Sequence, residues 1–433
     1  MSSIIDKALQ VLSKYSLCDH CLGRLFAKLG YGLENAERGR AIKNLALMKL
    51  HEELLKCESD DDRRRIIEQI YRIAVTGHEA AMKFLKNFNI NVQVENCYIC
   101  ESRIFNNIDK LVDLALIEIK KSGVEFKKFH VGTTLPREIL KKELNLTLEF
   151  NIDTAESIKR ELNRILGKMI RRRLGRYVEV DISSPDVVII IDPLQETINL
   201  EVRPQYILTR YRKLIRAISQ AQIYKNVITS IERELEKLKN ATSCSEVIIH
   251  ASGREDIDAR MLGSGRPTII EISKPIRRLE LDDLSKLLEN THEFIEFSKT
   301  LTLTSSREVR KLKKASERDV KIYRVLTILD NDVSDEQLVS LENYFRNRQV
   351  TQYIPRRIKR KPKWRKRVKM IYELKIHKVC ERILELLIKC QGGLYVKEFI
   401  TSDEGRTEPS IAGTLGVNAY PVELDVLDVL EVP

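Results

Sequence analysis

The sequence lacks the features that mark membrane and secreted proteins. Its longest uninterrupted apolar run, residues 187–191, is far shorter than the ~20 residues that a membrane-spanning helix needs. Asp6, Lys7 and Lys14 interrupt the first stretch of the chain, which excludes the continuous apolar core of a secretory signal. The composition, with one tryptophan and 17 glycines, also excludes a fibrous protein. We therefore expect a cytoplasmic protein with no membrane partner.

Acidic residues are fewer than basic ones. The chain has 63 Asp and Glu against 75 Lys and Arg, which gives a formal net charge of +12 over 433 residues. Ten of the fourteen residues in the segment 356–369 are Lys or Arg, and a second basic cluster follows a predicted helix at Arg171, Arg172, Arg173 and Arg176. A charge run is often only a solvated surface. Two separate clusters on a basic chain favour a nucleic acid as the partner over an acidic protein.

The pattern of apolar residues changes twice along the chain. Up to about residue 89 it has a helical period, with expected helices at 4–12, 36–56 and 65–88 separated by an acidic break at 59–62, and an expected strand at 92–94 follows. Between residues 105 and 203 helices (108–121, 137–142, 157–173) alternate with strands (126–131, 177–182, 187–191, 198–202). Strands dominate after Pro204, with one expected helix at 379–389. We predict an α+β protein with three domains, residues 1–104, 105–203 and 204–433.

Four of the eight cysteines form two Cys-x-x-Cys pairs, Cys18 with Cys21 and Cys97 with Cys100. Each pair can supply two thiolates from one tight turn, which is half of a tetrahedral zinc site. Because 75 residues separate the two pairs, such a site would tie distant segments together. A closed set of four thiolates leaves no position for a substrate, so we expect structural zinc, with His20 outside the ligand set. Unrelated reduced thiols or a redox pair are the alternatives.

The segment 250–267 holds the densest group of chemically reactive side chains. Asp256 and Asp258 lie among Arg254, Arg260 and Arg266, in what the pattern predicts to be a glycine-containing loop between apolar strands. Loops at strand ends commonly display catalytic residues. Arginines there would hold a carboxylate ionised and could also bind phosphate. A turn whose charges merely pair with one another accounts for the pattern equally well.

The same segment resembles a known family. Gly253-Arg-Glu-Asp256, followed by Asp258, Arg260 and Gly265-Arg-Pro267, is similar to the catalytic loop of the archaeal and eukaryotic tRNA pseudouridine synthases that modify uridines 54 and 55. Further similar segments are Cys18-Asp-His-Cys-Leu-Gly-Arg24, the later Cys97/Cys100 pair, Lys321-Ile-Tyr323, Gly393-Leu-Tyr395-Val-Lys397 and, in the family's RNA-binding THUMP domain, Phe129-His-Val-Gly-Thr-Thr-Leu-Pro136.

The resemblance implies a fold and an activity. The fold would be a zinc-stapled helical N-terminal region, a THUMP-like α/β module and a pseudouridine synthase domain built on a mixed, mainly antiparallel sheet. The activity would be isomerisation of uridine 54, uridine 55 or both in the TΨC arm of tRNA. That reaction involves no redox change and no energy input, so the expected partner is tRNA, with no cofactor for catalysis and no nucleotide. We expect a monomer.

The resemblance also assigns roles to single residues. Asp256 would be the catalytic aspartate, acting as nucleophile or as base, and Asp258 is its competitor. Tyr323 would stack on the target base and Tyr395 would pack against the flipped uridine. Lys397 would pair with Asp256. Arg254 and Arg260 would complete the substrate-binding set. Without the resemblance, Tyr323 would be read as a core residue and Lys397 as an ordinary surface lysine.

Two alternatives remain open at this point. The first is another THUMP-linked tRNA-modifying enzyme, such as a methyltransferase or a thiolation enzyme. The absence of G-x-G-x-x-G after a strand, and of a Walker-type G-K-[ST], argues against it. The second is a non-catalytic, zinc-containing tRNA-binding protein, which a catalytic test of Asp256 would distinguish.

Overall fold

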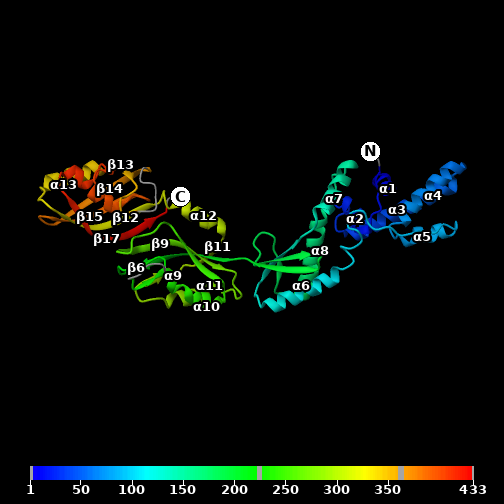
Figure 1. Cartoon of the computed structure of the whole chain (residues 1–433), viewed down its shortest axis with the longest axis horizontal. Helices are drawn as coiled ribbons and strands as arrows, with labels where there is room; N and C mark the ends of the chain where they lie inside the picture. The colour runs from blue at the N-terminus through cyan, green and yellow to red at the C-terminus, as the bar shows by residue number, and fades with distance from the viewer. Residues whose placement is uncertain (1–2, 222–226, 359–364, 432–433) are drawn as a thin grey trace. The chain divides into compact units, whose positions relative to one another are not determined.

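The computed structural model describes residues 3–221, 227–358 and 365–431, and its chain forms two compact units, Met1–Arg203 and Pro204–Pro433 (Figure 1). The middle of the basic segment, residues 359–364, lies outside the described residues. Within the described ranges, no helix is long and apolar enough to span a membrane. The predicted domain boundary at residue 104 falls inside the first unit and stays a prediction.

The first unit begins with helices and continues as a mixed helix and sheet module (Figure 1). Its elements are α1 (Ile4–Lys14), α2 (Asp19–Leu25), α3 (Asn35–Lys56), α4 (Asp60–Ala74), α5 (Glu79–Lys86), α6 (Ile108–Ser122), β1 (Lys128–Thr133), α7 (Arg137–Glu149), α8 (Ile158–Leu174), β2 (Glu179–Val180), β3 (Val187–Asp192) and β4 (Thr197–Val202).

The sheet of the first unit has the strand order β2-β1-β3-β4, with β1 parallel to both β2 and β3, and β4 antiparallel to β3. One continuous hydrophobic core runs from Ala8 in α1 to Ile191 in β3. The helical N-terminal region and the sheet module therefore share their core.

Local sequence explains how key helices of this unit begin and pack. Ser59 caps α4, and the acidic stretch expected as a break forms the first turn of that helix, where carboxylates interact favourably with the helix dipole. Ser157 caps α8 in the same way. Helices α2 and α3 cross with their backbones in contact. The crossing requires glycine at position 23, since a Cβ there would lie 1.7 Å from the Asn35 carbonyl oxygen. This close crossing fixes the position of α2, which carries Cys21.

The second unit is built on an 11-stranded sheet. Its elements are β5 (Gln205–Lys213), β6 (Ile218–Ser219), β7 (Thr229–Ser230), α9 (Ile231–Glu234), α10 (Glu236–Thr242), β8 (Glu246–Ala251), β9 (Ala259–Ser273), α11 (Leu281–Glu289), β10 (Ile295–Phe297), β11 (Thr302–Thr304), α12 (Ser306–Ala315), β12 (Val320–Leu329), α13 (Asp335–Phe345), β13 (Arg348–Tyr353), β14 (Lys366–Cys380), β15 (Ile383–Gln391), α14 (Val396–Thr401), β16 (Thr407–Glu408), α15 (Ile411–Leu415) and β17 (Ala419–Leu430).

The strand order of this sheet is β10-β5-β9-β17-β12-β15-β14-β13-β16, with β11 paired to β5 and β8 paired to β9. Its pairs are antiparallel except for β9 with β17. Two large cores lie against the sheet, and Tyr323 on β12 packs against both. The predicted α+β class with a mixed, mainly antiparallel sheet is confirmed.

Besides the expected break at 59–62, three expectations about local structure are wrong. Residues 379–389 form no helix: they are the end of β14, a turn and most of β15, where Leu384, Leu386 and Ile388 are buried at every second position between β12 and β14. Residues 92–94 form no strand, since no neighbouring strand pairs with them in the described chain. Arg260 and Arg266 lie in strand β9, so the loop expected from 250 to 268 is only the short connection 252–258.

Candidate active site and metal centre

The four predicted cysteine ligands lie together in the first unit. The sulfur atoms of Cys18, Cys21, Cys97 and Cys100 all fall within 4.8 Å of one another, with Cys18 and Cys100 at 3.6 Å. A tetrahedral zinc with Zn–S bonds of about 2.3 Å would separate its sulfurs by about 3.8 Å, so the cluster has the right size and donor set for such an ion. His20 is outside the set, because its Nδ1 lies 2.8 Å from Glu161 and its ring stacks on Phe105.

A buried cation adjoins this cluster. Arg24 has no exposed surface, and its Nη1 donates to the Cys21 sulfur at 2.9 Å while its Nε donates to Glu143 at 2.9 Å. Four thiolates around a divalent ion carry a net charge of about −2, which a buried guanidinium partly offsets. The residues present therefore fit a structural metal ion.

We expect one zinc ion per chain in the purified protein, and loss of that ion in the double variant Cys18→Ser/Cys97→Ser. Removing two of four thiolates leaves an incomplete ligand set. Inductively coupled plasma mass spectrometry measures the metal content, and Cys57→Ser, which lies outside the cluster, is the matched control. A folded wild-type protein that contains no metal would refute the zinc assignment.

In the second unit, the connection from β8 to β9 presents the predicted catalytic loop. Asp256 Oδ2 lies 3.3 Å from Lys397 Nζ and 3.4 Å from Arg357 Nη1, and its side chain is about two-fifths exposed. Lys397 is the second residue of α14 and also contacts Asp258 at 2.7 Å. Arg357 is oriented by Glu398 at 2.6 Å. The aspartate that the sequence singles out is thus both reachable from solvent and flanked by two cations.

Two tyrosines predicted to bind the substrate lie in different settings. Tyr323 sits on β12 between the two cores, and burial raises the pKa of its hydroxyl well above the usual value, with the Asp256 charge acting in the same direction. Tyr395 directly precedes α14, and its backbone exchanges two hydrogen bonds with the Gln352 amide at 2.8 and 2.9 Å. The Arg367 guanidinium lies over the Tyr395 ring, 5.2 Å from its centre.

The two predicted substrate-binding arginines differ in their surroundings. Arg254 is exposed in the 252–258 connection. Arg260, on β9, donates to both carboxylate oxygens of the buried Asp425, at 2.9 and 2.5 Å, and Arg216 contacts the same carboxylate at 2.8 Å. The structure therefore gives Arg260 a structural partner that the sequence did not indicate.

Sequence reasoning missed a buried charge network beneath the loop. Glu255 is fully buried and lies 2.7 Å from Arg266 Nε and 3.6 Å from Lys213 Nζ, and it accepts from the Tyr211 hydroxyl at 3.0 Å. Burial alone would raise the pKa of Glu255, but Arg266 and Lys213 hold it below its usual value. Lys213 also donates to the Asp256 carbonyl oxygen at 3.1 Å. The network therefore anchors the backbone of the predicted catalytic loop.

A second anchor lies under the start of the loop. Gly253 has a φ of +79°, and a Cβ there would lie 2.8 Å from Lys321 Nζ. Lys321 is buried on β12, and burial lowers the pKa of its amine to about 8. Ser252 donates to the buried Asp319 at 2.5 Å. Glycine at position 253 lets the chain turn over Lys321, so this position favours a residue without a side chain.

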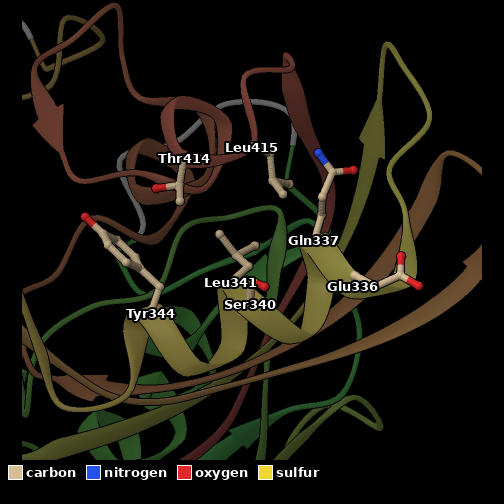
Figure 2. A pocket seen from close by; sticks show the side chains of 7 residues that line it. All are labelled: Glu336, Gln337, Ser340, Leu341, Tyr344, Thr414 and Leu415. Carbon is tan, nitrogen blue, oxygen red and sulfur yellow. The ribbon is translucent and has the colours of Figure 1, made fainter.

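The second unit also has a pocket of about 330 Å³ between α13 and α15 (Figure 2). Glu336, Ser340 and Tyr344 line it from α13, and Thr414 and Leu415 line it from α15. It contains none of the predicted site residues, so we do not assign it to the catalytic site.

In the first unit, α8 borders a basic groove of about 1390 Å³, here called the α8 groove. The cations that line it are Lys159, Arg160, Arg164, Lys168, Arg171, Arg172 and Arg176. Arg173, which the sequence grouped with them, instead pairs with Asp113 on α6 at 2.7 Å. Apart from this arginine, the structure gathers the predicted basic cluster on a single concave surface.

Comparison with known proteins defines the class to which this fold and loop belong. The family model described as the C-terminal region of Pus10 matches residues 206–430, and the model of the archaeal Pus10 THUMP domain matches residues 115–192. The second unit is thus of the pseudouridine synthase class, and the sheet module of the first unit is a THUMP domain.

Full-length relatives identify the particular family. The chain is 40% identical to the tRNA pseudouridine synthase Pus10 of Vulcanisaeta distributa over 98% of this chain and 99% of that protein. It is 38% identical to the protein of the same name from Pyrobaculum arsenaticum, over 98% and 99%. Among solved structures, a Cbf5-Nop10-Gar1 complex matches with a TM-score of 0.31 and 13% identity, covering 52% of this chain and 50% of that one. The chain belongs to the Pus10 family.

Family membership confirms the resemblance inferred from the sequence and the enzyme class, an isomerase that converts uridine to pseudouridine. It replaces the alternative of a THUMP-linked methyltransferase or thiolation enzyme.

Proposed function

We propose that this chain isomerises uridine 54, uridine 55 or both in the TΨC arm of tRNA, and that Asp256 is the catalytic aspartate. The observation that carries the proposal is the position of Asp256, exposed at the tip of a buried scaffold and within 3.4 Å of both Lys397 and Arg357. Lys397 and Arg357 hold one carboxylate oxygen of Asp256 in place by ion pairs. A carboxylate positioned next to the ribose is what the reaction needs, whether Asp256 acts as nucleophile or as base.

The reaction balances without an added reagent. The bond from N1 of uracil to C1′ of ribose breaks, the base turns, and a bond from C5 to C1′ forms. The proton lost from C5 is matched by the proton that N1 gains. No electrons enter or leave, so we expect no cofactor and no nucleotide for catalysis.

The surroundings of Asp256 suit an extruded nucleotide. A uridine within a folded RNA arm must leave its stack, which costs a few kcal/mol, before a side chain can reach its ribose. Tyr395, backed by the Arg367 guanidinium, offers a face for the flipped base. Tyr323 lies on β12 and packs against both cores of the second unit, so it would contact the base from the protein interior. Arg254 and Arg260 remain our candidates for contacts to phosphate or ribose.

The Asp256 site and the α8 groove have complementary tasks. The seven cations of the groove provide a surface for RNA phosphates. We assign the domains as 1–104 for the helical metal-binding region, 105–203 for the THUMP domain and 204–433 for catalysis. We expect the enzyme to act as a cytoplasmic monomer with structural zinc in its cysteine cluster.

The position of the modification is tested with three unmodified tRNA transcripts: the natural sequence, one with cytidine at position 54 and one with cytidine at position 55. We expect carbodiimide mapping to show pseudouridine in the TΨC arm of the natural transcript, with each cytidine removing the signal at its own position. Pseudouridine found only outside this arm would overturn the assigned substrate position.

A further inference from the structure

The loop between α2 and α3 presents a bare aromatic side chain. Tyr31 is fully exposed, and it stands between Gly30 at φ +70° and Gly32 at φ +87°. Left-handed backbone on both sides of one tyrosine forms a narrow tip that glycine alone adopts without strain. An aromatic ring held entirely in water gains nothing for the fold.

The tip is held firmly from below. Arg38 is buried, and its guanidinium donates to the carbonyl oxygens of Leu29 at 2.8 Å, Gly30 at 3.1 Å and Leu33 at 3.0 Å. A buried arginine that binds three loop carbonyls fixes the backbone in one conformation. The exposed ring is therefore displayed on an ordered support.

Hydrogen bonds tie the same loop to the α8 groove. Glu34, at the end of the loop, accepts from Arg164 and from Lys168, the latter at 2.7 Å. Asn35 donates to Glu156 at 2.8 Å. Arg164, Lys168 and Glu156 all line the groove, so the residues that follow the Tyr31 tip, Glu34 and Asn35, are bonded to its lining.

Positive charge exceeds negative charge in the α8 groove, whose lining includes seven cations and two carboxylates, Glu156 and Glu179. Residues 160, 164, 168, 172 and 176 are all Lys or Arg, at intervals of four along α8 and its end. Like charges at this spacing destabilise a helix. In the described part of the chain, Arg160, Arg172 and Arg176 have no acidic partner within 4 Å.

A second exposed tyrosine follows the C-terminal end of α8. Tyr177 is 92% exposed and comes directly after Arg176 and Gly175, both of which line the groove. The 17 residues of α8 span about 25 Å. The Tyr31 loop is thus tied to the middle of α8, at Arg164 and Lys168, and Tyr177 lies just beyond the C-terminal end of the helix.

We propose that Tyr31 and Tyr177 are stacking platforms for unpaired bases of a single-stranded RNA segment whose phosphates lie along α8. The bases of a duplex are covered by their neighbours, whereas the bases of a single strand can stack on aromatic side chains. The inference rests on the proposed function, since it assumes that the substrate is RNA, and it adds which RNA structure the first unit recognises.

The test compares two RNA probes on the full chain by fluorescence anisotropy: a blunt 12-base-pair duplex, and the same duplex with a four-nucleotide single-stranded extension. We expect the wild type to bind the extended probe at least tenfold more tightly. Tyr31→Ala should lose about tenfold for the extended probe and nothing for the blunt one, since base stacking on an aromatic ring is worth about this much. Tyr177→Ala should show the same pattern, and Tyr31→Phe should match the wild type.

Two further variants separate stacking from charge and from general surface effects. Arg160→Ala/Arg172→Ala should weaken both probes alike and reduce the salt dependence of binding, because it removes phosphate contacts. Leu55→Ala, at a residue 76% exposed on α3, should change neither probe. If Tyr31→Ala affects both probes equally, or neither, the stacking proposal is wrong. If the wild type binds neither these probes nor tRNA, the proposed function itself fails.

Discussion

Asp256→Asn should lower the rate of pseudouridine formation by at least about a thousandfold while leaving tRNA binding nearly unchanged. Asparagine keeps the size of the side chain but cannot serve as nucleophile or as base, and a positioned acid–base group alone contributes about 10²–10⁴-fold. The measurement is tritium release from C5 of labelled uridine in tRNA under single-turnover conditions with saturating enzyme, so that the rate reports chemistry and not binding.

Asp258→Asn is the matched control for this prediction. Asp258 lies two residues away in the same connection, and its carboxylate is 2.7 Å from Lys397, which also pairs with Asp256. Of the two carboxylates, that of Asp258 is the more exposed. We expect Asp258→Asn to reduce the rate less than tenfold, through the altered position of Lys397. A thousandfold loss in Asp258→Asn with an active Asp256→Asn would exchange the roles of the two residues.

Arg266→Met should destabilise the second unit by about 3–5 kcal/mol, because removing one member of a buried ion pair strands the other. Arg266 and Glu255 are both fully buried, and the guanidinium also donates to the Ser252 carbonyl oxygen at 2.7 Å. The calorimetric unfolding transition of the full chain at pH 7 measures the change. Arg212→Met, which breaks the exposed pair with Glu296, should cost no more than about 1 kcal/mol.

The pH dependence of this effect has a defined sign. The pKa of Glu255 is lower in the folded protein than in the unfolded chain, so its pairing stabilises the fold at neutral pH and this stabilisation is lost as the pH falls through the folded pKa. In Arg266→Met the Glu255 carboxyl loses its nearer cation and keeps Lys213 at 3.6 Å, and protonation can neutralise it. The difference between wild type and variant should therefore shrink as the pH is lowered below about 4.5. A difference that stays constant from pH 7 down to about pH 3 would show that lost packing, and not the charge, causes the destabilisation.

The sequence predicts those parts of the candidate site whose residues lie close together along the chain. The cysteine pairs are legible because each pair spans one turn, and the structure brings Cys18 and Cys100 to 3.6 Å. The loop from Gly253 to Asp258 can be recognised because its four charged residues lie within five positions. The pairing of Lys397 with Asp256 was expected from the family resemblance, and the structure places the two side chains 3.3 Å apart.

Contacts between residues far apart in the sequence could not be predicted from it. Glu255 looks like one more loop acid, yet it points inward to Tyr211, which lies 44 positions earlier. Arg357 reads as one charge in a basic run, whereas its partners Asp256 and Glu398 lie 101 and 41 positions away. The alternation of side chains near a strand end could have suggested that the residue before Asp256 points inward, but it could not have identified the partners of Glu255.

The errors in secondary structure have the same origin. Leu387, an exposed apolar residue, interrupts the alternation of β15 and makes its sequence resemble a helix. The two neighbouring strands, β12 and β14, decide the conformation, and neither is visible in a local window. Conversely, Val92 and Val94 alternate like a strand but have no partner strand among the described residues.

The most direct test of the central claim is tritium release from a [5-³H]uridine-labelled tRNA transcript by the wild-type chain, without added nucleotide or redox reagent, followed by mapping of the product. We predict release that reaches completion, pseudouridine in the TΨC arm, and no release from an equally well bound complex with Asp256→Asn. Tight binding of tRNA by the wild type with no release of tritium would contradict the account.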